Sequence, residues 1–279
     1  MYNGERRDAS GCPKRMAHTK SLTFDQAAGS YDATRGFPPG VSDLVGDAVA
    51  EMIGSNARVL EIGIGTGRIA KPLLARGFRV TGVDLSQKMM RRLLETLPPD
   101  GSRPALIQAD AAQLPLASGR FDAVVSVHVF HLVAHWHEAL AEVRRSLKPE
   151  GILLIGYDWR PPDSPGARIL KQWKEIIRAR GPASDPPGAW DFDDVTAALI
   201  DMGAALDERA AGEWTTTRTL AQHIETVEHR TWSADWIVPD NFFPECLAEL
   251  RDWATREYGA LEREFAIQHK FVWQRFQWN

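Results

Sequence analysis

The sequence predicts an α/β fold with a mostly parallel sheet and helices on both of its faces. From Phe24 onward, short apolar runs alternate with helical stretches, which is the pattern of successive βα units. A glycine-rich turn directly follows the first apolar run, and an acidic residue stands at the end of each of the first three runs. In an open parallel sheet, the carboxyl ends of the strands are where ligands bind.

The elements of this sheet can be placed in order along the chain. The expected strands are the apolar runs at 57–62, 79–83, 105–108, 121–127 and 152–157. A helix follows the glycine turn, and further helices are expected at 87–96 and about 137–146. The run at 121–127 is almost continuously apolar, which is typical of a strand buried on both faces.

The composition changes after Tyr157, because nine of the ten tryptophans lie beyond it. Apolar positions around 220–227 and 247–261 predict two amphipathic helices, and the aromatic segment at 267–278 predicts a closing strand. We therefore expect a flexible tail at 1–23 and one domain at 24–279, with a helical cap inserted at about 213–264.

Composition excludes several classes of partner. The net charge is −4 and no segment concentrates Lys and Arg, so nucleic acid is not expected as a partner. Cys12 and Cys246 have no paired spacing, which favours a reducing compartment, and the first twenty residues contain no apolar core of a signal peptide or anchor. We expect a cytoplasmic protein that acts on a small molecule away from membranes, either as a monomer or as a homodimer.

The glycine turn is the most informative segment. In VLEIGIGTGR, Gly63, Gly65 and Gly67 let a ligand approach the backbone where a helix begins. Glu61 stands two residues before the first glycine, and Asp84 ends the next strand, 21 residues after Gly63. A carboxylate at the second position can accept hydrogen bonds from both hydroxyls of a ribose.

Two classes of nucleoside cofactor use such a turn. The dinucleotide fingerprint requires a small residue where this chain has Arg68, and Glu61 would repel a pyrophosphate. Glu61 instead suits a cofactor with a cationic amino and sulfonium end. Asp110, after the third strand, is placed to accept from an adenine amino group. The alternative, that these acids only cap helices, is weakened because all three are in register with one glycine turn.

The chain resembles the class I S-adenosylmethionine (SAM)-dependent methyltransferases of the type 11 group, and is similar to the ubiquinone and menaquinone C-methyltransferases. The resemblance covers 24–157 and rests on motifs in family order: VLEIGIGTGRIAKPL, VTGVDLS, QADAAQLPL, FDAVVSVHVFHLV and LKPEGILLI. It implies a Rossmann-like, seven-stranded sheet with an antiparallel last strand. It also implies a methyltransferase (EC 2.1.1.-) that uses SAM and releases S-adenosyl-L-homocysteine (SAH).

The resemblance also implies which residues bind the cofactor. The segment at 31–35 looks like the short pre-domain piece that folds over SAM in this family. The residues carried over as cofactor-binding are Tyr31, Arg35, Glu61, Gly63, Gly65, Thr66, Gly67, Asp84, Leu85, Met89, Asp110, Ala111 and His128.

Methyl transfer needs little from the protein beyond positioning the acceptor and, for some acceptors, removing a proton. His128 and His131 follow the fourth strand, beside the expected methyl group, and are the candidate catalytic bases. For His131, pocket lining and inert packing stay open as alternatives. A metal site is not expected, because His131 and His135 have helical spacing but no third ligand.

The aromatic C-terminal half is the candidate acceptor region. Aromatic walls suit a flat or apolar molecule, although most of these rings have a second explanation as the core of the cap. The residues assigned to the acceptor are Tyr157, Trp159, Trp214, Trp232 and Trp236.

The sequence thus predicts a SAM-dependent methyltransferase that acts on a small aromatic or apolar acceptor. O-, N- and C-methylation all stay open. Two other functions compete with this prediction: a SAM-binding protein that does not methylate, and an NAD-dependent oxidoreductase. Arg68, Glu61 and the lack of a Tyr-x-x-x-Lys pair disfavour the oxidoreductase.

Overall fold

The computed structural model describes residues 20–25, 28–29, 31–180, 187–189, 192–236 and 238–278. The predicted tail at 1–23 lies outside the described residues except for its last four. In the described part of the chain, no helix is long and apolar enough to cross a membrane.

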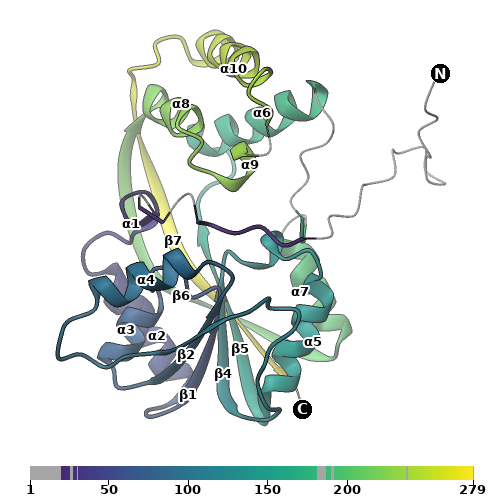
Figure 1. Cartoon of the computed structure of the whole chain (residues 1–279). Coiled ribbons are helices and arrows are strands. Elements are labelled where there is room, and N and C mark those ends of the chain that lie inside the picture. The colour runs from purple at the N-terminus through teal and green to yellow at the C-terminus, as the bar shows by residue number, and fades with distance from the viewer. Residues whose placement is uncertain are drawn as a thin grey trace, which may run out of the picture.

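A seven-stranded sheet forms the base of the molecule, in the order β3-β2-β1-β4-β5-β7-β6 (Figure 1). β7 runs antiparallel to both of its neighbours and the remaining pairs are parallel, which confirms the predicted mostly parallel sheet. The strands are β1 Arg58–Ile62, β2 Arg79–Asp84, β3 Ala105–Gln108, β4 Phe121–Val127, β5 Leu147–Trp159, β6 Ala204–Thr219 and β7 Glu264–Trp278.

Helices cover both faces of this sheet because successive strand residues point to opposite sides. Val59 packs with α2 (Val41–Ile53), α3 (Ala70–Ala75) and α4 (Gln87–Thr96) on one face. Leu60, its neighbour, packs on the other face with α5 (Trp136–Ser146) and α7 (Phe192–Asp201). Two apolar cores therefore hold the strands rigidly, and their carboxyl ends meet at one edge.

The edge strand β6 is the strand of the sheet that the sequence did not reveal. Six consecutive residues, from Ala205 to Ala210, are exposed, and the strand contains no apolar run. Its stability comes from one long antiparallel ladder with β7, which pairs Ala204 with Trp278 at one end and Thr219 with Glu264 at the other. A half-solvated edge strand does not show the pattern of a buried one.

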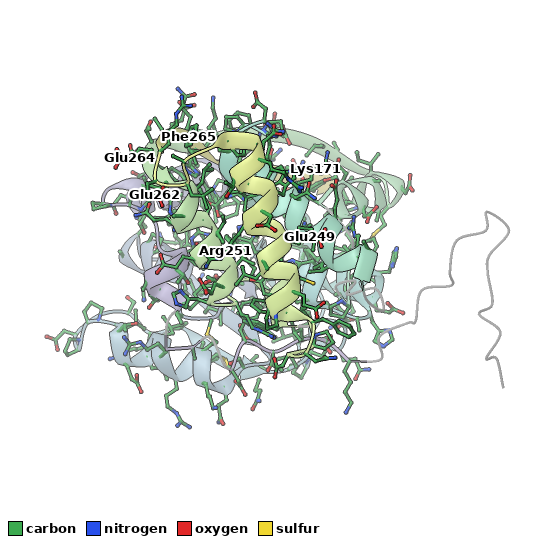
Figure 2. The ribbon with its side chains drawn as sticks, turned by 90° about the horizontal axis from the view of Figure 1, so that it is seen from above. Lys171, Glu249, Arg251, Glu262, Glu264 and Phe265 are labelled. Carbon is green, nitrogen blue, oxygen red and sulfur yellow. The ribbon has the colours of Figure 1, made fainter. Side chains whose placement is uncertain are left out.

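The helices α6 (Pro165–Arg180), α8 (Leu220–Glu228), α9 (Ser233–Trp236) and α10 (Phe243–Tyr258) gather above the carboxyl ends of the strands (Figure 1). Apolar side chains of α6, α8 and α10 form a third core, which includes Trp173, Ile224 and Leu250. Seen from above, α10 lies across the top of this group (Figure 2). We call these four helices the cap; the predicted domain limits themselves stay a prediction.

The N-terminal segment runs between the cap and the sheet (Figure 1). The Leu22 amide donates to the Leu132 carbonyl at 2.9 Å, and the Asp25 carboxylate accepts from Ser86 Oγ. The short helix α1 (Tyr31–Arg35) follows and lies near the glycine turn, since Thr66 Oγ1 donates to Asp32. This segment therefore closes the space above the strand ends from one side.

Candidate functional site

A cavity of about 700 Å³ lies between the carboxyl ends of the strands and the cap. It brings together residues that the sequence analysis selected from widely separated motifs. The predicted site residues in its lining are Tyr31, Arg35, Gly63, Gly65, Asp84, Leu85, Met89, Ala111, His128, His131, Trp214 and Trp232.

The three glycines of the turn have positive φ, of 72° at Gly63, 52° at Gly65 and 82° at Gly67, which L side chains rarely adopt. Their surroundings differ. A Cβ on Gly67 would stand 2.3 Å from Leu93 Cδ1 of α4, so Gly67 serves the packing of the turn and does not line the cavity. Gly63 and Gly65 do line it, although a Cβ on Gly63 would also stand 2.3 Å from Val129 Cγ2.

Asp84 fixes the turn to the end of β2. Its Oδ2 accepts from the Gly65 amide at 2.8 Å, and its Oδ1 accepts from the Ser86 amide at 2.7 Å. Burial raises the pKa of this carboxyl, while the hydrogen bonds from the two backbone amides oppose the rise. Each oxygen keeps a further lone pair for a hydroxyl donor, and the residue lines the cavity.

Glu61 lies beneath the turn and is only 4% exposed. Burial, together with the neighbouring Asp84, raises its pKa well above the usual range. Its Oε2 is buried and has no hydrogen-bond partner among the described residues. An unpartnered buried carboxyl oxygen is costly to maintain, and a nearby cation would offset that cost.

Asp110 has a different environment from the one predicted. Its Oδ2 accepts from Ser21 Oγ at 3.0 Å and its Oδ1 accepts from the Ala112 amide at 2.9 Å. Asp110 is not in the cavity lining, whereas its neighbours Ala109 and Ala111 are. The carboxylate therefore anchors the N-terminal segment beside the site.

Helix α1 contributes two of the predicted residues and joins them to the cap. Arg35 donates to the Thr231 carbonyl at 3.3 Å, and its guanidinium lies 4.0 Å from the centre of the Trp232 ring. Tyr31 packs edge-on against Phe24 at 5.9 Å. Thr66 does not line the cavity; its hydroxyl instead holds α1 in place through Asp32.

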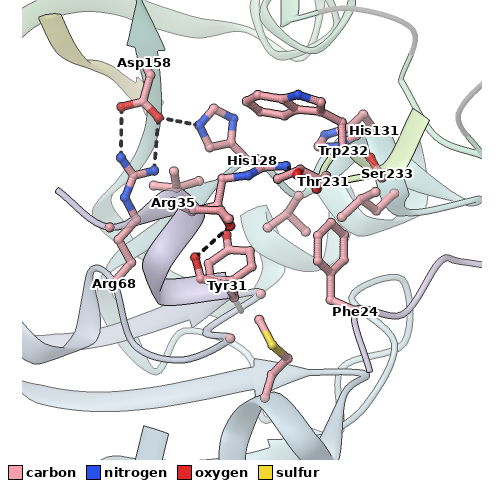
Figure 3. Close-up of a pocket in the computed structure, with 18 of the residues that line it drawn as sticks. Phe24, Tyr31, Arg35, Arg68, His128, His131, Asp158, Thr231, Trp232 and Ser233 are labelled. Carbon is pink, nitrogen blue, oxygen red and sulfur yellow. Dashed lines mark hydrogen bonds and ion pairs between the residues drawn. The ribbon is translucent and has the colours of Figure 1, made fainter. Parts of the chain in front are cut away.

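A hydrogen-bonded chain of three residues spans the cavity wall, from Arg68 through Asp158 to His128 (Figure 3). Both terminal nitrogens of Arg68 donate to the Asp158 carboxylate, at 2.9 and 3.0 Å, and His128 Nε2 lies 2.9 Å from Asp158 Oδ2. Burial alone would raise the pKa of Asp158, but the His128 hydrogen bond and the Arg68 charge bring it far below its usual range. We call this set the Arg68 relay.

His128 has φ of 57°, which is uncommon for a non-glycine residue and concentrates at functional sites. Because Asp158 only accepts, His128 Nε2 carries the hydrogen, and in the neutral ring the lone pair is on Nδ1. Asp158 was missed as a site residue. The bulky Arg68 in a position that favours a small residue was the one signal for it in the sequence.

His131 lines the same cavity but is electrostatically different. Burial, and then the charges of His128, Arg35 and Lys174, lower its pKa to about 3. The ring is therefore neutral near pH 7 and is a weak base there. His135 stands at the start of α5, outside the cavity lining. Among the described residues, no three His, Cys, Asp or Glu side chains gather as a metal site.

Two of the five rings assigned to the acceptor line the cavity. Trp214 stacks on His269 with centroids 5.3 Å apart, and Trp232 lies over Arg35. Trp236 packs against Phe24 at 4.7 Å and is not in the lining.

Tyr157 and Trp159 also lie outside the cavity lining, for a reason of strand geometry. In β5 the intervening Asp158 points into the cavity, so both of its neighbours point to the opposite face of the sheet. There Tyr157 packs on Phe192 of α7, with ring centroids 4.5 Å apart.

A second cavity, of about 560 Å³, adjoins the first and shares His128, His131 and Trp232 with it. It runs beneath α6, and its walls include Phe130, Ile155 and further apolar residues. Asp235 belongs to this wall and is fully buried. It accepts from Trp173 Nε1 at 2.8 Å and from the Trp232 amide at 2.9 Å, which positions Trp232.

Comparison with known proteins identifies the family. A family model described as a methyltransferase domain matches residues 60–155. A methyltransferase of Geobacillus thermodenitrificans, named as uncharacterized, is 32% identical over 166 residues, which are 57% of this chain and 74% of that protein. The chain belongs to the class I SAM-dependent methyltransferases. Within this methyltransferase family, the likeness to quinone C-methyltransferases stays a prediction.

Another methyltransferase relative is the malonyl-[acyl-carrier protein] O-methyltransferase of Laribacter hongkongensis, 31% identical over 192 residues. The match covers 66% of this chain but only 62% of that protein. The crystal structure of a candidate methyltransferase of Bacillus halodurans superposes with a TM-score of 0.56 and 17% identity, covering 85% of this chain and 98% of the other. This likeness supports the fold of a class I methyltransferase.

Proposed function

We propose that this methyltransferase binds SAM along the strand ends and transfers its methyl group to a small organic acceptor held beneath the cap. One observation carries the proposal: the first cavity has the glycine turn and Asp84 on its sheet side, and it adjoins a second cavity that runs under the cap. The acceptor side and the cofactor side thus meet at His128 and His131.

The residues of the sheet side suit this cofactor. The free lone pairs of Asp84 are available to ribose hydroxyls, and Leu85, Met89 and Ala111 offer an apolar surface for adenine. A cationic ligand would stabilise the ionised form of the unpartnered Glu61 carboxyl beneath the turn, whereas a pyrophosphate would be repelled by it. When bound, SAM would supply a methyl group already activated by its sulfonium, so no nucleophilic side chain is required.

The cap side is suited to an apolar acceptor body. The walls of the second cavity are rich in apolar side chains, including Phe130, Ile155 and Ile177. The Laribacter hongkongensis relative is named for an acyl group on a carrier protein. Acyl compounds are therefore the first acceptor class to screen, followed by aromatic ones.

The two histidines take different roles in this proposal. His128 is the better base, because the Arg68 relay fixes its tautomer and leaves Nδ1 to accept a proton from the acceptor. His131 is neutral and a weak base, so it lines the passage between the two cavities. An acceptor that is already anionic would not need either base.

The test is calorimetric titration of the purified protein with SAM, SAH and NADH in parallel. We expect binding of both adenosyl ligands and none of NADH. Binding of NADH alone would refute the assignment and favour an oxidoreductase. Release of SAH during an acceptor screen then separates an enzyme from a SAM-binding protein that does not methylate. Cytoplasmic location and oligomeric state stay predictions.

A further inference from the structure

We propose that the methyl acceptor carries an anionic group, a carboxylate or a phosphate, and that the cavity holds it in a basic subsite on its cap side. The subsite consists of Arg160, Arg218, His223 and His269, all of which line the first cavity. Its role in acceptor binding rests on the proposed function, whereas its affinity for anions can be measured without it.

Four different elements bring these residues to one wall. Arg160 directly follows β5, Arg218 is near the end of β6, His223 is on α8 and His269 is on β7. On β6, Arg218 shares the cavity face with Trp214 and Thr216 because strand residues alternate. On β7, His269 is paired directly with Trp214 and faces the same way. Arg218 and His223 are close in the sequence, whereas Arg160 and His269 are far from both and are brought to them by the fold.

The two guanidinium groups lack a carboxylate partner. In the described part of the chain, Arg160 forms no hydrogen bond or ion pair, since the nearby Asp158 is already engaged by Arg68 and His128. Among the described residues, Arg218 donates only to neutral oxygens, those of Gln222 and Thr226. Burial, and then the charge of Arg218, lower the pKa of Arg160 even though Asp158 opposes this. Partly buried arginines without an anion bind carboxylates and phosphates strongly.

His223 carries an unsatisfied nitrogen at the same place. Its Nε2 is buried and has no hydrogen-bond partner among the described residues. The ring lies against the first turn of α6, where a Cβ on Gly166 would stand 2.5 Å from Cε1. Burial, followed by the charges of Arg218, Arg160 and His269, lowers the pKa of His223 to about 4. The subsite thus holds a neutral imidazole, and a bound anion would favour its protonated form, in which both ring nitrogens donate.

His269 completes the subsite from β7, the strand that pairs with β6. It lies with Nε2 2.8 Å from Thr216 Oγ1 and stacks on Trp214. Its pKa is lowered by burial and by Arg160 and Arg218, against the opposite effect of Asp158. The imidazole is therefore held in a fixed orientation beside both arginines.

The charge distribution assigns this subsite to the acceptor and not to the cofactor. A sulfonium would be repelled by the arginines, and it finds its acids on the sheet side. On the cap side the acid in the lining is the exposed Glu225, which leaves the subsite with a positive balance. Arg160 also lines the second cavity. An acceptor whose anionic group is held by Arg160 would therefore place its apolar part in that cavity, beneath α6.

Calorimetry with two simple probes tests the inference: inorganic phosphate and malonate, each titrated into free and SAH-saturated protein. We expect saturable binding of at least one probe, and its identity distinguishes a phosphate-bearing from a carboxylate-bearing acceptor. Arg160→Gln and Arg218→Gln should each weaken binding about tenfold or more, because each removes a charge-assisted hydrogen bond. Arg92→Gln, on the exposed face of α4 near Glu95, is the matched control and should bind as wild type.

Imidazole resonances of the wild-type protein give a second readout that needs no variant. Probe binding should shift the His223 and His269 signals and leave those of the exposed His135, which lines neither cavity, in place. Absence of anion binding, or equal affinity in wild type and both variants, would overturn this inference while SAH binding remains intact. Failure of SAH to bind the wild type would instead overturn the proposed function, and the acceptor role of the subsite with it.

Discussion

The sheet side and the cap side of the cavity have opposite charge. Asp84, at the end of β2, lines the sheet side and Glu61 lies buried beneath the turn, whereas Arg160 after β5 and Arg218 of β6 give the cap side its positive charge. The Arg68 relay lies between them and neutralises itself. This difference indicates that the two reactants are sorted by charge. The cationic cofactor belongs on the sheet side and the anionic acceptor on the cap side.

The largest effect is expected from a substitution on the sheet side. Asp84→Ala should weaken SAH binding about 100-fold or more, because two charge-assisted hydrogen bonds to ribose and the support of Gly65 are lost. Calorimetry measures this directly. Asp122→Ala is the matched control, since Asp122 also accepts a backbone amide, that of Arg58, but at the far end of the sheet. Unchanged SAH affinity in Asp84→Ala would remove the sheet side from the cofactor site.

The second prediction concerns the boundary between the two sides. Asp158→Asn should lower turnover with the screened acceptor by about tenfold or more, because His128 loses the acceptor that fixes its tautomer. SAH affinity should change less than turnover. Tyr157→Phe is the control, being the adjacent residue on the opposite face of β5. A variant that loses SAH affinity but keeps its turnover at saturation would place the relay in the cofactor site instead.

The third prediction concerns the cap side through Asp235, whose pKa burial raises to about 6 despite hydrogen bonds from Trp232 and Trp173. The folded state therefore holds its proton more tightly than the unfolded state, in which the pKa is about 3.9. This contribution to stability is complete below pH 4 and is lost as the pH rises through 6.

Asp235→Asn should abolish that loss, which is on the order of 2 kcal/mol. Urea unfolding at pH 4 and pH 7, compared with wild type, measures it. An equal change in stability between the two pH values for both proteins would show that Asp235 titrates normally.

The smallest effect is expected at His131. Because its pKa of about 3 makes it neutral and weakly basic, His131→Ala should lower turnover only severalfold and leave SAH affinity unchanged. The pH profile of wild-type turnover should show no step from this group between pH 5 and 8. A loss of 100-fold or more that small amine bases restore would make His131 the general base.

The sheet side could be predicted from the sequence because its signals are local. Glu61, Asp84 and Ala111 each lie at the end of a recognisable strand or shortly after it, and the glycine turn follows the first strand. The parallel sheet then brings these three residues to one edge. The main deviation there is Asp110. Its carboxylate accepts a hydrogen bond from Ser21, which lies 89 residues earlier in the sequence, and this contact could not be predicted from local signals.

The cap side could not be predicted in the same way. Its residues depend on the pairing of β6 with β7, and β6 shows no buried pattern that would reveal its register. Without that register, neither the juxtaposition of Trp214 with His269 nor the direction of Arg218 can be inferred. The alternation along β5 could have been used, since it excludes Tyr157 from the face that presents Asp158.

The long ladder between β6 and β7 has a consequence for how this enzyme can change. It runs from the pair Ala204 and Trp278 to the pair Thr219 and Glu264 with one register shift between Ala210 and Gly212, and most of the cap is inserted beyond its last pair. A replacement segment grafted between these two positions would meet a preformed two-stranded stem that already has a fixed twist. Exchanging this segment, with α6 adapted to it, would thus change the cap around the acceptor while Arg160, Arg218, His269 and the nucleoside end of the protein stay in place.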